Sequence, residues 1–403
     1  MRNILNNATS AATLTVIAGL AACLIAGSAG AEDRILKIGV LGTMSGPAAS
    51  WGLVSKYAAE ATAQMYNEKG GVKIGEASYK IQIVAVDDRL DVKYAILGAE
   101  QLTRKDHIKY IIGPNVDTTA VAIVPVIESA GAINVTYSFW RSLYTSRDGN
   151  SILGMVASYQ AAPLIYRYLM DSRGVKTVSF VARSETDPLN QRTEGVRVAK
   201  SMGLKVLSAD VTYKLGTTDF HPVLEGVVKQ KPDLIVLSGV APAEAPLLVK
   251  AARELGFKGQ LSTETAQDAK LLREGAGEAA DGFISVGGAS AAEIRSPYME
   301  SFIDHYKKIA GEWNDEAGTK AYALEMLLAT LQKAGPKAIG DIDQFKEAMP
   351  KVALLNPFMK DKSLLRYVGR SSFGRLRQIG VPVVVNEFRD GDFKTLFTAS
   401  VSD

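Results

Sequence analysis

Short strands alternate with helices along this chain, and this alternation restricts its possible folds more than any other feature of the sequence. Four short runs rich in β-branched residues predict strands at 35–41, 80–86, 110–112 and 132–136. Segments with helical spacing lie between them. In one of these, Val54, Ala58, Ala61 and Met65 share one face of a helix that ends at Gly70. Strands separated by helices in this way pair in parallel, with helices on both faces of the sheet.

The alternation occurs in two blocks, so the sequence predicts two sheets. In the second block we expect strands at 176–182, 204–212, 233–238, 260–261 and 283–286, and helices at 189–202, 220–229 and 244–255. Further helices at 298–309, 320–333 and 342–348 precede a terminal hairpin of 381–388 and 393–397. A chain of 403 residues, 47% of them hydrophobic, can form two domains. The expected fold class is α/β, with two doubly wound parallel sheets.

The first 31 residues have the features of a secretory signal peptide. Arg2 is the only charged residue before Glu32, and an apolar run covers 14–25. The sequence Ala29-Gly30-Ala31 then supplies the small-x-small pattern that signal peptidase cleaves. We therefore expect cleavage after Ala31 and a periplasmic protein.

Two alternatives for this leader remain open. A retained membrane helix is disfavoured, because the apolar run is shorter than the roughly 20 residues that a bilayer requires and contains Gly19. The sequence up to Cys23 also fits the pattern at which bacterial lipoproteins are cut and acylated. Against this, apolar residues continue after Cys23, where a lipoprotein normally becomes polar.

Composition argues against several classes of partner. The chain has 46 basic and 43 acidic residues, with no run of like charges, so we expect no nucleic-acid or anionic-membrane partner. Cys23 is the only cysteine, and its removal with the leader would leave no thiol for a disulfide or a metal. Stability must then come from burial of the core.

A search for catalytic groups is mostly negative. The three histidines, His107, His221 and His305, are isolated in polar helical contexts, and we expect each at the surface. A dinucleotide site is disfavoured, because Gly39, Gly42 and Gly46 do not have the G-x-G-x-x-G spacing. We expect no enzyme activity, no metal and no cofactor.

Several motifs, in order, resemble the leucine/isoleucine/valine-binding proteins. They are Lys37-Ile38-Gly39-Val40, Ser45-Gly46-Pro47, Trp51-Gly52, Asn67-Glu68-Lys69-Gly70-Gly71, Asp87-Asp88 and Tyr110-Ile111-Ile112-Gly113-Pro114. That family consists of type I periplasmic binding proteins, which deliver solutes to ABC importers. The resemblance spans nearly the whole chain after the leader.

The resemblance implies two lobes joined by three crossovers, with the ligand in the cleft between them. It places the signal peptide at 1–31, the N-terminal lobe at 32–153 plus about 285–360, and the C-terminal lobe at 154–284 plus about 361–403. It also implies a small-molecule ligand and the membrane permease subunits of an importer as partners, and we expect a monomer. A periplasmic sensor subunit would use the same fold.

The sheets themselves indicate where such a cleft lies. The carboxyl ends of parallel strands and the amino ends of the following helices face one crevice. The loops that should line it are 45–51, 115–119 and 137–141 in the first lobe, and 183–188, 240–242 and 263–266 in the second.

The family's binding positions transfer to the first lobe only in part. Trp51 matches an aromatic wall of the ligand pocket, or else packs on its own lobe. Asp117 falls where amino-acid binders place a serine that holds the ligand carboxylate, so it either contacts the ligand or caps the helix expected at Thr118. Ser138, Phe139 and Trp140 occupy the stretch that holds the ligand ammonium group, and two of them are unusually large.

The second lobe departs further from the family. Its Asp-x-x-Tyr-Gly pattern is replaced by the segment from Arg183 to Pro188, which includes Asp187. A family tyrosine falls on Ala241 or Pro242, and the acidic partner of the ligand ammonium group aligns with Thr265 or, after a one-residue slip, Glu264.

The complete amino-acid clamp is therefore missing. The expected cargo is a branched-chain or other apolar amino acid. The alternative is an aromatic or other apolar organic acid, with Arg183 or Arg141 as its carboxylate partner, and either arginine could instead be a solvated surface residue.

Overall fold

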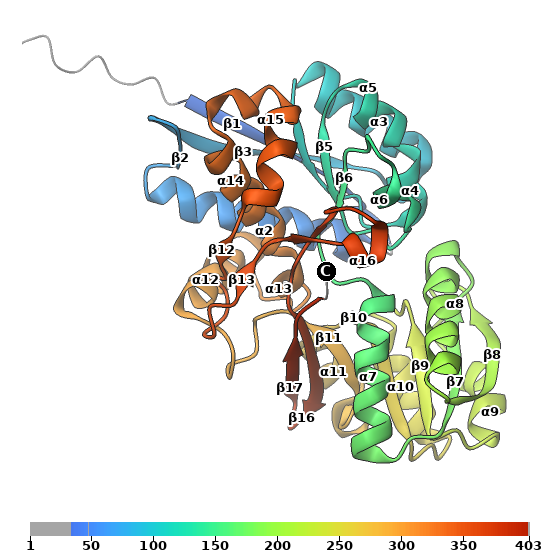
Figure 1. The fold of residues 1–403 in the computed structure, drawn as a ribbon. Helices are drawn as coiled ribbons and strands as arrows, with labels where there is room; N and C mark the ends of the chain where they lie inside the picture. The colour runs from blue at the N-terminus through green and yellow to red at the C-terminus, as the bar shows by residue number, and fades with distance from the viewer. Residues whose placement is uncertain (1–33, 47, 402–403) are drawn as a thin grey trace, which may run out of the picture.

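The computed structural model of the chain describes residues 34–46 and 48–401, which form two α/β lobes (Figure 1). The expected signal peptide lies outside these residues, as do its cleavage site after Ala31, the alternative site at Cys23, and Pro47. Within the described residues, no helix combines the length and the apolar character needed to cross a membrane.

The first lobe is built on an eight-stranded sheet with the order β14-β15-β6-β5-β4-β1-β3-β2. The six strands from β15 to β3 are parallel, and one antiparallel strand lies at each edge. The strands are β1 (Arg34–Gly42), β2 (Val72–Ile74), β3 (Ala77–Asp87), β4 (Tyr110–Ile112), β5 (Ile133–Thr136), β6 (Ser151–Leu153), β14 (Tyr367–Val368) and β15 (Gln378–Ile379). Strands β4 and β5 are buried throughout, as expected for a sheet covered on both faces.

The second lobe is built on a seven-stranded sheet with the order β17-β16-β11-β10-β9-β7-β8. Its first five strands along the chain are parallel, and a terminal antiparallel hairpin extends the sheet beside β11. The strands are β7 (Thr177–Arg183), β8 (Lys205–Tyr213), β9 (Leu234–Ser238), β10 (Gln260–Ala266), β11 (Ile284–Gly287), β16 (Val383–Arg389) and β17 (Asp392–Ala399). The expected fold class is confirmed.

Helices cover both faces of each sheet. Those of the first lobe are α2 (Ala49–Glu68), α3 (Val92–Glu100), α4 (Asp117–Ala122), α5 (Val124–Ser129), α6 (Ser142–Thr145), α12 (Pro297–Ala310), α13 (Ala317–Lys320), α14 (Tyr322–Ala334), α15 (Ile342–Ala348) and α16 (Arg370–Phe373). Those of the second lobe are α7 (Ser158–Arg173), α8 (Thr186–Ser201), α9 (His221–Lys229), α10 (Ala245–Glu254) and α11 (Ala269–Gly275). A small hairpin of β12 (Leu354–Leu355) and β13 (Leu364–Leu365) lies apart from both sheets.

The chain crosses between the two sheets three times. It leaves the first sheet after β6, returns after β11, and crosses again between β15 and β16. The last crossing therefore lies between Ile379 and Val383, whereas the resemblance placed it near residue 360. The reason is that β14 and β15 contain only two residues each, too few for a strand pattern to be seen in the sequence.

Other differences from the sequence prediction have local causes. Helix α7, which was not predicted, carries Pro163 in its interior, a residue that normally indicates a helix end. The expectation of a surface position is wrong for His305, which is buried. Its Nε2 lies 3.0 Å from Glu68 Oε2 and its Nδ1 lies 2.6 Å from Ser301 O, because α12 packs along α2.

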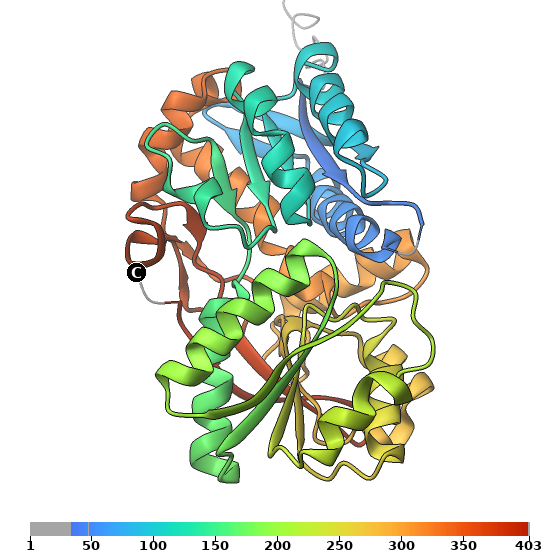
Figure 2. The same ribbon diagram turned by 90° about the vertical axis from the view of Figure 1, so that its right-hand side faces the viewer.

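The largest apolar cluster is shared by the two lobes. It runs from Val40 of β1 and Ala58 of α2 through Phe302 of α12 to Ile165 of α7 and Val178 of β7. Separate clusters lie on the opposite faces of the two sheets, beneath α3 and α5 in the first lobe and beneath α9 and α10 in the second. Helix α8 meets the first lobe at its amino-terminal end, where it contacts α4, and extends from there along the second lobe (Figure 2).

Gly52 determines how the first turn of α2 meets the end of β1. Its N–H donates to Thr43 O at 2.9 Å, and a Cβ at this position would lie 2.2 Å from the same oxygen. Thr43 has no room to move, because its hydroxyl donates to buried Asp88 at 2.6 Å. Glycine is therefore required, and it fixes the neighbouring Trp51 at the carboxyl edge of the sheet.

We predict that Gly52→Ala lowers the free energy of unfolding by about 1–3 kcal/mol, because the added methyl group must displace backbone. Urea denaturation followed by circular dichroism measures this change. The matched control is Gly226→Ala in α9, where a Cβ would meet no atom within 4 Å. This control should raise stability by about 0.5–1 kcal/mol. Equal effects of the two substitutions would contradict the assigned role of Gly52.

Candidate functional site

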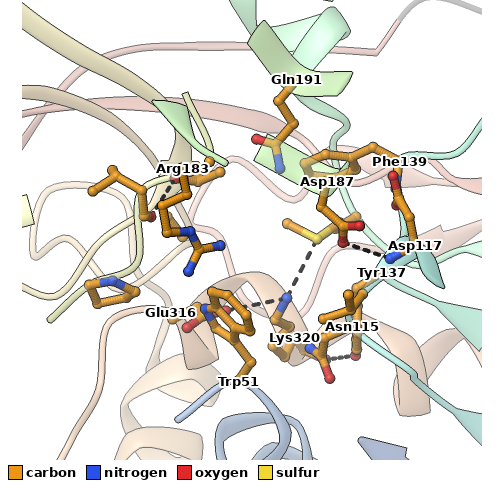
Figure 3. Close-up of a pocket in the computed structure, with 17 residues that line it drawn as sticks. Trp51, Asn115, Asp117, Tyr137, Phe139, Arg183, Asp187, Gln191, Glu316 and Lys320 are labelled. Carbon is orange, nitrogen blue, oxygen red and sulfur yellow. Dashed lines mark hydrogen bonds and ion pairs between the residues drawn. The ribbon is translucent and has the colours of Figure 1, made fainter. Parts of the chain in front are cut away.

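A pocket lies between the lobes, at the carboxyl ends of parallel strands of both sheets (Figure 3). Its empty volume is about 620 Å³, part of which is open to solvent. The first lobe contributes Trp51, Asn115, Val116, Asp117, Tyr137, Phe139, Met155, Glu316 and Lys320. The second lobe contributes Arg183, Asp187, Gln191, Gly239, Val240, Pro242, Thr265 and Ala266. Each of the six loops expected at the cleft supplies at least one of these residues.

The structure brings together seven of the candidate residues named from the sequence. These are Trp51, Asp117, Phe139, Arg183, Asp187, Pro242 and Thr265. The other five, Thr118, Ser138, Trp140, Ala241 and Glu264, do not line the pocket. Thr118 is exposed and Trp140 is 40% exposed, so neither is enclosed by the two lobes.

Arg183 carries the most unusual charge in the pocket. Only 4% of it is exposed, yet it donates no hydrogen bond to any residue that the structure describes. Its Nε lies 3.6 Å from Glu185 Oε2 and 3.8 Å from Glu244 Oε2, beyond hydrogen-bond distance. The guanidinium group points toward the centre of the pocket, 5.0 Å from the ring centroid of Trp51 in the opposite lobe (Figure 3). It is a nearly fully buried cation whose donors are available to a ligand.

A second buried cation, Lys320, was missed by the sequence analysis. Its Nζ lies 3.5 Å from Glu316 Oε1, 3.5 Å from Met155 Sδ and 4.0 Å from the ring centroid of Tyr137. Burial lowers the pKa of the Lys320 ammonium group, and the Glu316 carboxylate partly offsets this effect. The i, i+4 pair on α13 was the only signal in the sequence, and such pairs are usually found on exposed helix surfaces.

Asp117 does not cap its own helix. It is the first residue of α4, and its carboxylate turns toward the loop at 137–141. There it accepts hydrogen bonds from Ser138 Oγ at 2.6 Å and from Phe139 N at 2.9 Å, while Trp140 N donates to Ser138 Oγ. The N–H groups of this loop that could have held a ligand anion are therefore already satisfied. Burial raises the pKa of Asp117, although these hydrogen bonds act in the opposite direction.

Asp187 meets Asp117 from the second lobe. Its Oδ2 accepts a hydrogen bond from Asp117 N at 2.7 Å, and nearby Asn190 Nδ2 lies 3.5 Å from Asp117 Oδ2. Burial raises the pKa of Asp187 to about 7, and the charge of Asp117 adds to the increase. The pKa values of both carboxylates are therefore raised where they meet.

Glu264 lies beneath the pocket and not in it. It is buried against α7, where Tyr166 donates a hydrogen bond to its Oε1, and Oε2 has no partner among the described residues. Burial raises the pKa of Glu264 to about 7. Its neighbour Thr265 faces the pocket, because successive side chains of a strand point to opposite faces.

The remaining walls are largely apolar. Trp51, Tyr137, Phe139, Val240 and Pro242 present aromatic and aliphatic surface around the charged groups. Among the residues that the structure describes, no group of three His, Cys, Asp or Glu side chains is arranged to hold a metal ion. The arrangement can enclose a small molecule that combines an apolar body with a charged group.

Two α/β lobes with such a pocket between them define a two-lobed solute-binding protein. The family described as periplasmic binding protein matches residues 35–370, and the chain belongs to this family. The Leu/Ile/Val-binding protein of Escherichia coli K12 is 28% identical over 356 residues, which cover 86% of this chain and 92% of that protein. A Pseudomonas aeruginosa protein that binds leucine, isoleucine, valine, threonine and alanine is 23% identical over 320 residues, 78% of this chain and 83% of that protein. The resemblance read from the sequence motifs is confirmed.

Solved structures share the fold. A leucine-binding protein from Thermotoga maritima has a TM-score of 0.74 and 21% identity, over 90% of this chain and 98% of that one. Another similar structure is a solute-binding protein of an ABC transporter from Rhodopseudomonas palustris HaA2, in complex with p-hydroxybenzoic acid. It has a TM-score of 0.75 and 21% identity, over 92% of this chain and 98% of that one. The same two-lobed architecture thus serves an amino acid in one neighbour and an aromatic acid in the other.

The raised pKa of Glu264 predicts a pH-dependent cost to stability. The unfolded chain releases this proton near pH 4.5 and the folded chain near 7, so the free energy of unfolding should fall as pH rises across that interval. Glu264→Gln keeps an acceptor for Tyr166 and removes the titration. Its stability relative to the parent should rise by on the order of 1–3 kcal/mol between pH 4.5 and 7.5, measured by urea denaturation. A constant difference would show that the pKa of Glu264 is the same in the folded and the unfolded chain.

Proposed function

We propose that this protein is the receptor of an ABC importer, which captures a small solute in the cleft and delivers it to the permease subunits without altering it chemically. Membership of the periplasmic binding protein family supports this role. So do similar structures described as solute-binding proteins of ABC transporters. The two lobes would close over the solute, and contacts that both lobes make only when they meet would favour the closed form. We infer that the receptor works as a monomer.

The preferred ligand is an apolar organic acid, with aromatic acids among the candidates. The observation that carries this proposal is Arg183, whose buried guanidinium group points into the pocket and donates no hydrogen bond to residues 34–46 or 48–401. A ligand carboxylate can receive two parallel hydrogen bonds from such a group. The apolar body would then lie against Trp51 and Phe139, where burial contributes about 25 cal/mol per Å².

Two features argue against the ligand arrangement expected for amino-acid binders. The position of the serine that holds the ligand carboxylate is occupied by Asp117, whose own carboxylate already accepts the N–H of Phe139. The acidic group at Glu264, expected to hold a ligand ammonium group, is sealed away with Tyr166. Neither pole of an amino acid would find the partner that the family resemblance implied.

An apolar amino acid remains the second candidate, and one observation favours it. Asp117 and Asp187 line the pocket with no basic side chain in ion-pair contact among the described residues, so an ammonium group could lie beside them. The relatives that bind leucine, isoleucine and valine support the same candidate. The ligand would then bind in the opposite orientation to that implied by the family resemblance. Its ammonium group would lie beside Asp117 and its carboxylate beside Arg183.

Matched pairs of ligands separate the two candidates. Leucine and 4-methylpentanoate differ only in the ammonium group, as do phenylalanine and 3-phenylpropanoate, and 4-hydroxybenzoate and benzoate complete the set. We expect the acids without an ammonium group to give the larger thermal shifts and the tighter binding by calorimetry. Tighter binding of leucine and phenylalanine would overturn the preferred ligand but keep the receptor role. No binding of any of the six would count against this pocket as a carboxylate site.

The proposed carboxylate partner can be tested directly. Arg183→Met should weaken the best-binding acid by about 2–5 kcal/mol, because a buried charge loses its partner. Arg183→Lys keeps the charge but not the planar fork, so it should recover only part of the affinity. The control is Arg197→Met on α8, an exposed residue that forms an ion pair with Glu194. Unchanged affinity in Arg183→Met, with an intact fold by circular dichroism, would rule out this assignment.

We also propose export to the periplasm with cleavage after Ala31. The family match begins at residue 35, directly after the expected site, and the family is periplasmic. A protein that begins at Glu32 and one acylated at Cys23 differ in mass. The intact mass of the exported chain should be that of a protein that begins at Glu32. The mass of a lipid-modified chain that begins at Cys23 would show instead that the protein is a lipoprotein.

A further inference from the structure

Two pairs of aspartates join the lobes at separate places. In the first pair, Asp117 N of α4 donates to Asp187 Oδ2 of α8 at 2.7 Å. In the second pair, Asp315 N, just before α13, donates to Asp268 Oδ2, just after β10, at 3.2 Å. Ala269 N returns a hydrogen bond to Asp315 Oδ2 at 3.1 Å. In both places an N–H group of one lobe meets a carboxylate of the other, so separation of the lobes would break these contacts.

Closure takes these carboxylates out of water. Asp117 and Asp268 are buried, and Asp187 and Asp315 are partly buried. Burial raises the pKa of Asp315 to about 6 and that of Asp187 to about 7, and in each pair the charge of the partner aspartate raises it further. The pKa values of Asp117 and Asp268 are raised as well, also chiefly by burial. The N–H donors act in the opposite direction without cancelling the effect.

The surrounding charges do not neutralise the pairs. Around the first pair lie Arg183, Glu185, Arg141, Glu194, Tyr159 and the Lys320–Glu316 ion pair. Arg183 lowers the pKa of Asp187, whereas Glu185 raises it. Around the second pair lie Glu312, Asp392, Lys270, Arg273, Arg295 and Lys307. Lys270 already pairs with Glu312, and Arg295 with Glu300.

We propose that the two aspartate pairs make lobe closure proton-dependent, so that the cleft closes more readily as the surroundings become more acidic. In an open protein all four carboxylates face water and release their protons near pH 4. In the closed protein the pairs retain protons up to pH 6–7. Closure therefore takes up protons, and the closed state is favoured as pH falls through this range and disfavoured above it. This device consists of the protein's own residues and operates in the absence of a ligand.

The test follows closure in the ligand-free chain. In a Cys23→Ser background, Glu76→Cys in the first lobe and Lys258→Cys in the second provide exposed attachment sites for two dyes. Single-molecule energy transfer then measures the ratio of closed to open molecules. Between pH 8 and pH 5.5 this ratio should rise by about tenfold to a hundredfold, from the proton uptake of the two raised groups.

Asparagine variants separate proton linkage from a general effect of pH. Asp187→Asn and Asp315→Asn keep an oxygen that accepts the same N–H and imitate the protonated carboxyl. Each should remove part of the pH response, and the double variant should lose most of it and close more than the parent at pH 8. The control is Asp233→Asn, whose carboxylate accepts the N–H groups of Lys176 and Thr177 within one lobe, and which should respond to pH like the parent.

Three outcomes would overturn the proposal. They are a parent ratio that does not change with pH, a double variant that keeps the parent's response, and a control that loses it. Because no ligand is present, these outcomes are independent of the ligand screen and of the Arg183 variants. Circular dichroism at each pH confirms that both lobes remain folded during the measurement.

Discussion

Parallel pairing of the strands is the constraint on which the rest of this structure depends. Because the central strands of each sheet run in one direction, their carboxyl ends and the helix starts that follow them lie at one edge, and both edges face the same boundary. Polar groups that the sheets leave unpaired are thereby collected in the cleft. In the first loop, two contacts fix the backbone at this edge of the sheet. They are the close approach of Gly52 to Thr43 and the buried hydrogen bond from Thr43 to Asp88. The pocket is thus a consequence of the topology, and the side chains in it determine only what it holds.

The fold could be predicted from the sequence where elements are long and regular. The β-branched run at 35–41 and the apolar face of Val54 to Met65 were sufficient, because each pattern repeats several times within one element. The limits appear at β14 and β15, whose two-residue length carries no pattern, and in α7, where Pro163 is accommodated inside a helix that packs against α8 and β10. Where tertiary contacts decide the local structure, the local sequence cannot indicate it.

The sequence was sufficient to predict which loops line the site, but less sufficient to predict which side chains face it. All six expected loops reach the pocket, since strand ends determine their place. Which way a side chain turns depends on partners distant in the sequence. Glu264 is drawn to Tyr166 of α7, 98 residues away, and Asp117 to Ser138 and Phe139. Lys320 enters from a segment that follows no strand, so the rule that located the loops does not apply to it.

The charges that line the pocket connect ligand binding to proton binding. Lys320 is accompanied by Glu316, and Arg183 by Glu185 and Glu244, whereas Asp117 and Asp187 have no basic partner in ion-pair contact among the described residues. In a closed cleft these two carboxylates need either a proton or a positive group of the ligand, because an isolated buried charge is unfavourable. A ligand with an ammonium group at this place would displace the proton, and a simple carboxylate anion would leave it bound. The same pair of residues therefore connects two properties, which are the preference between amino acids and simple acids and the ease with which the lobes close.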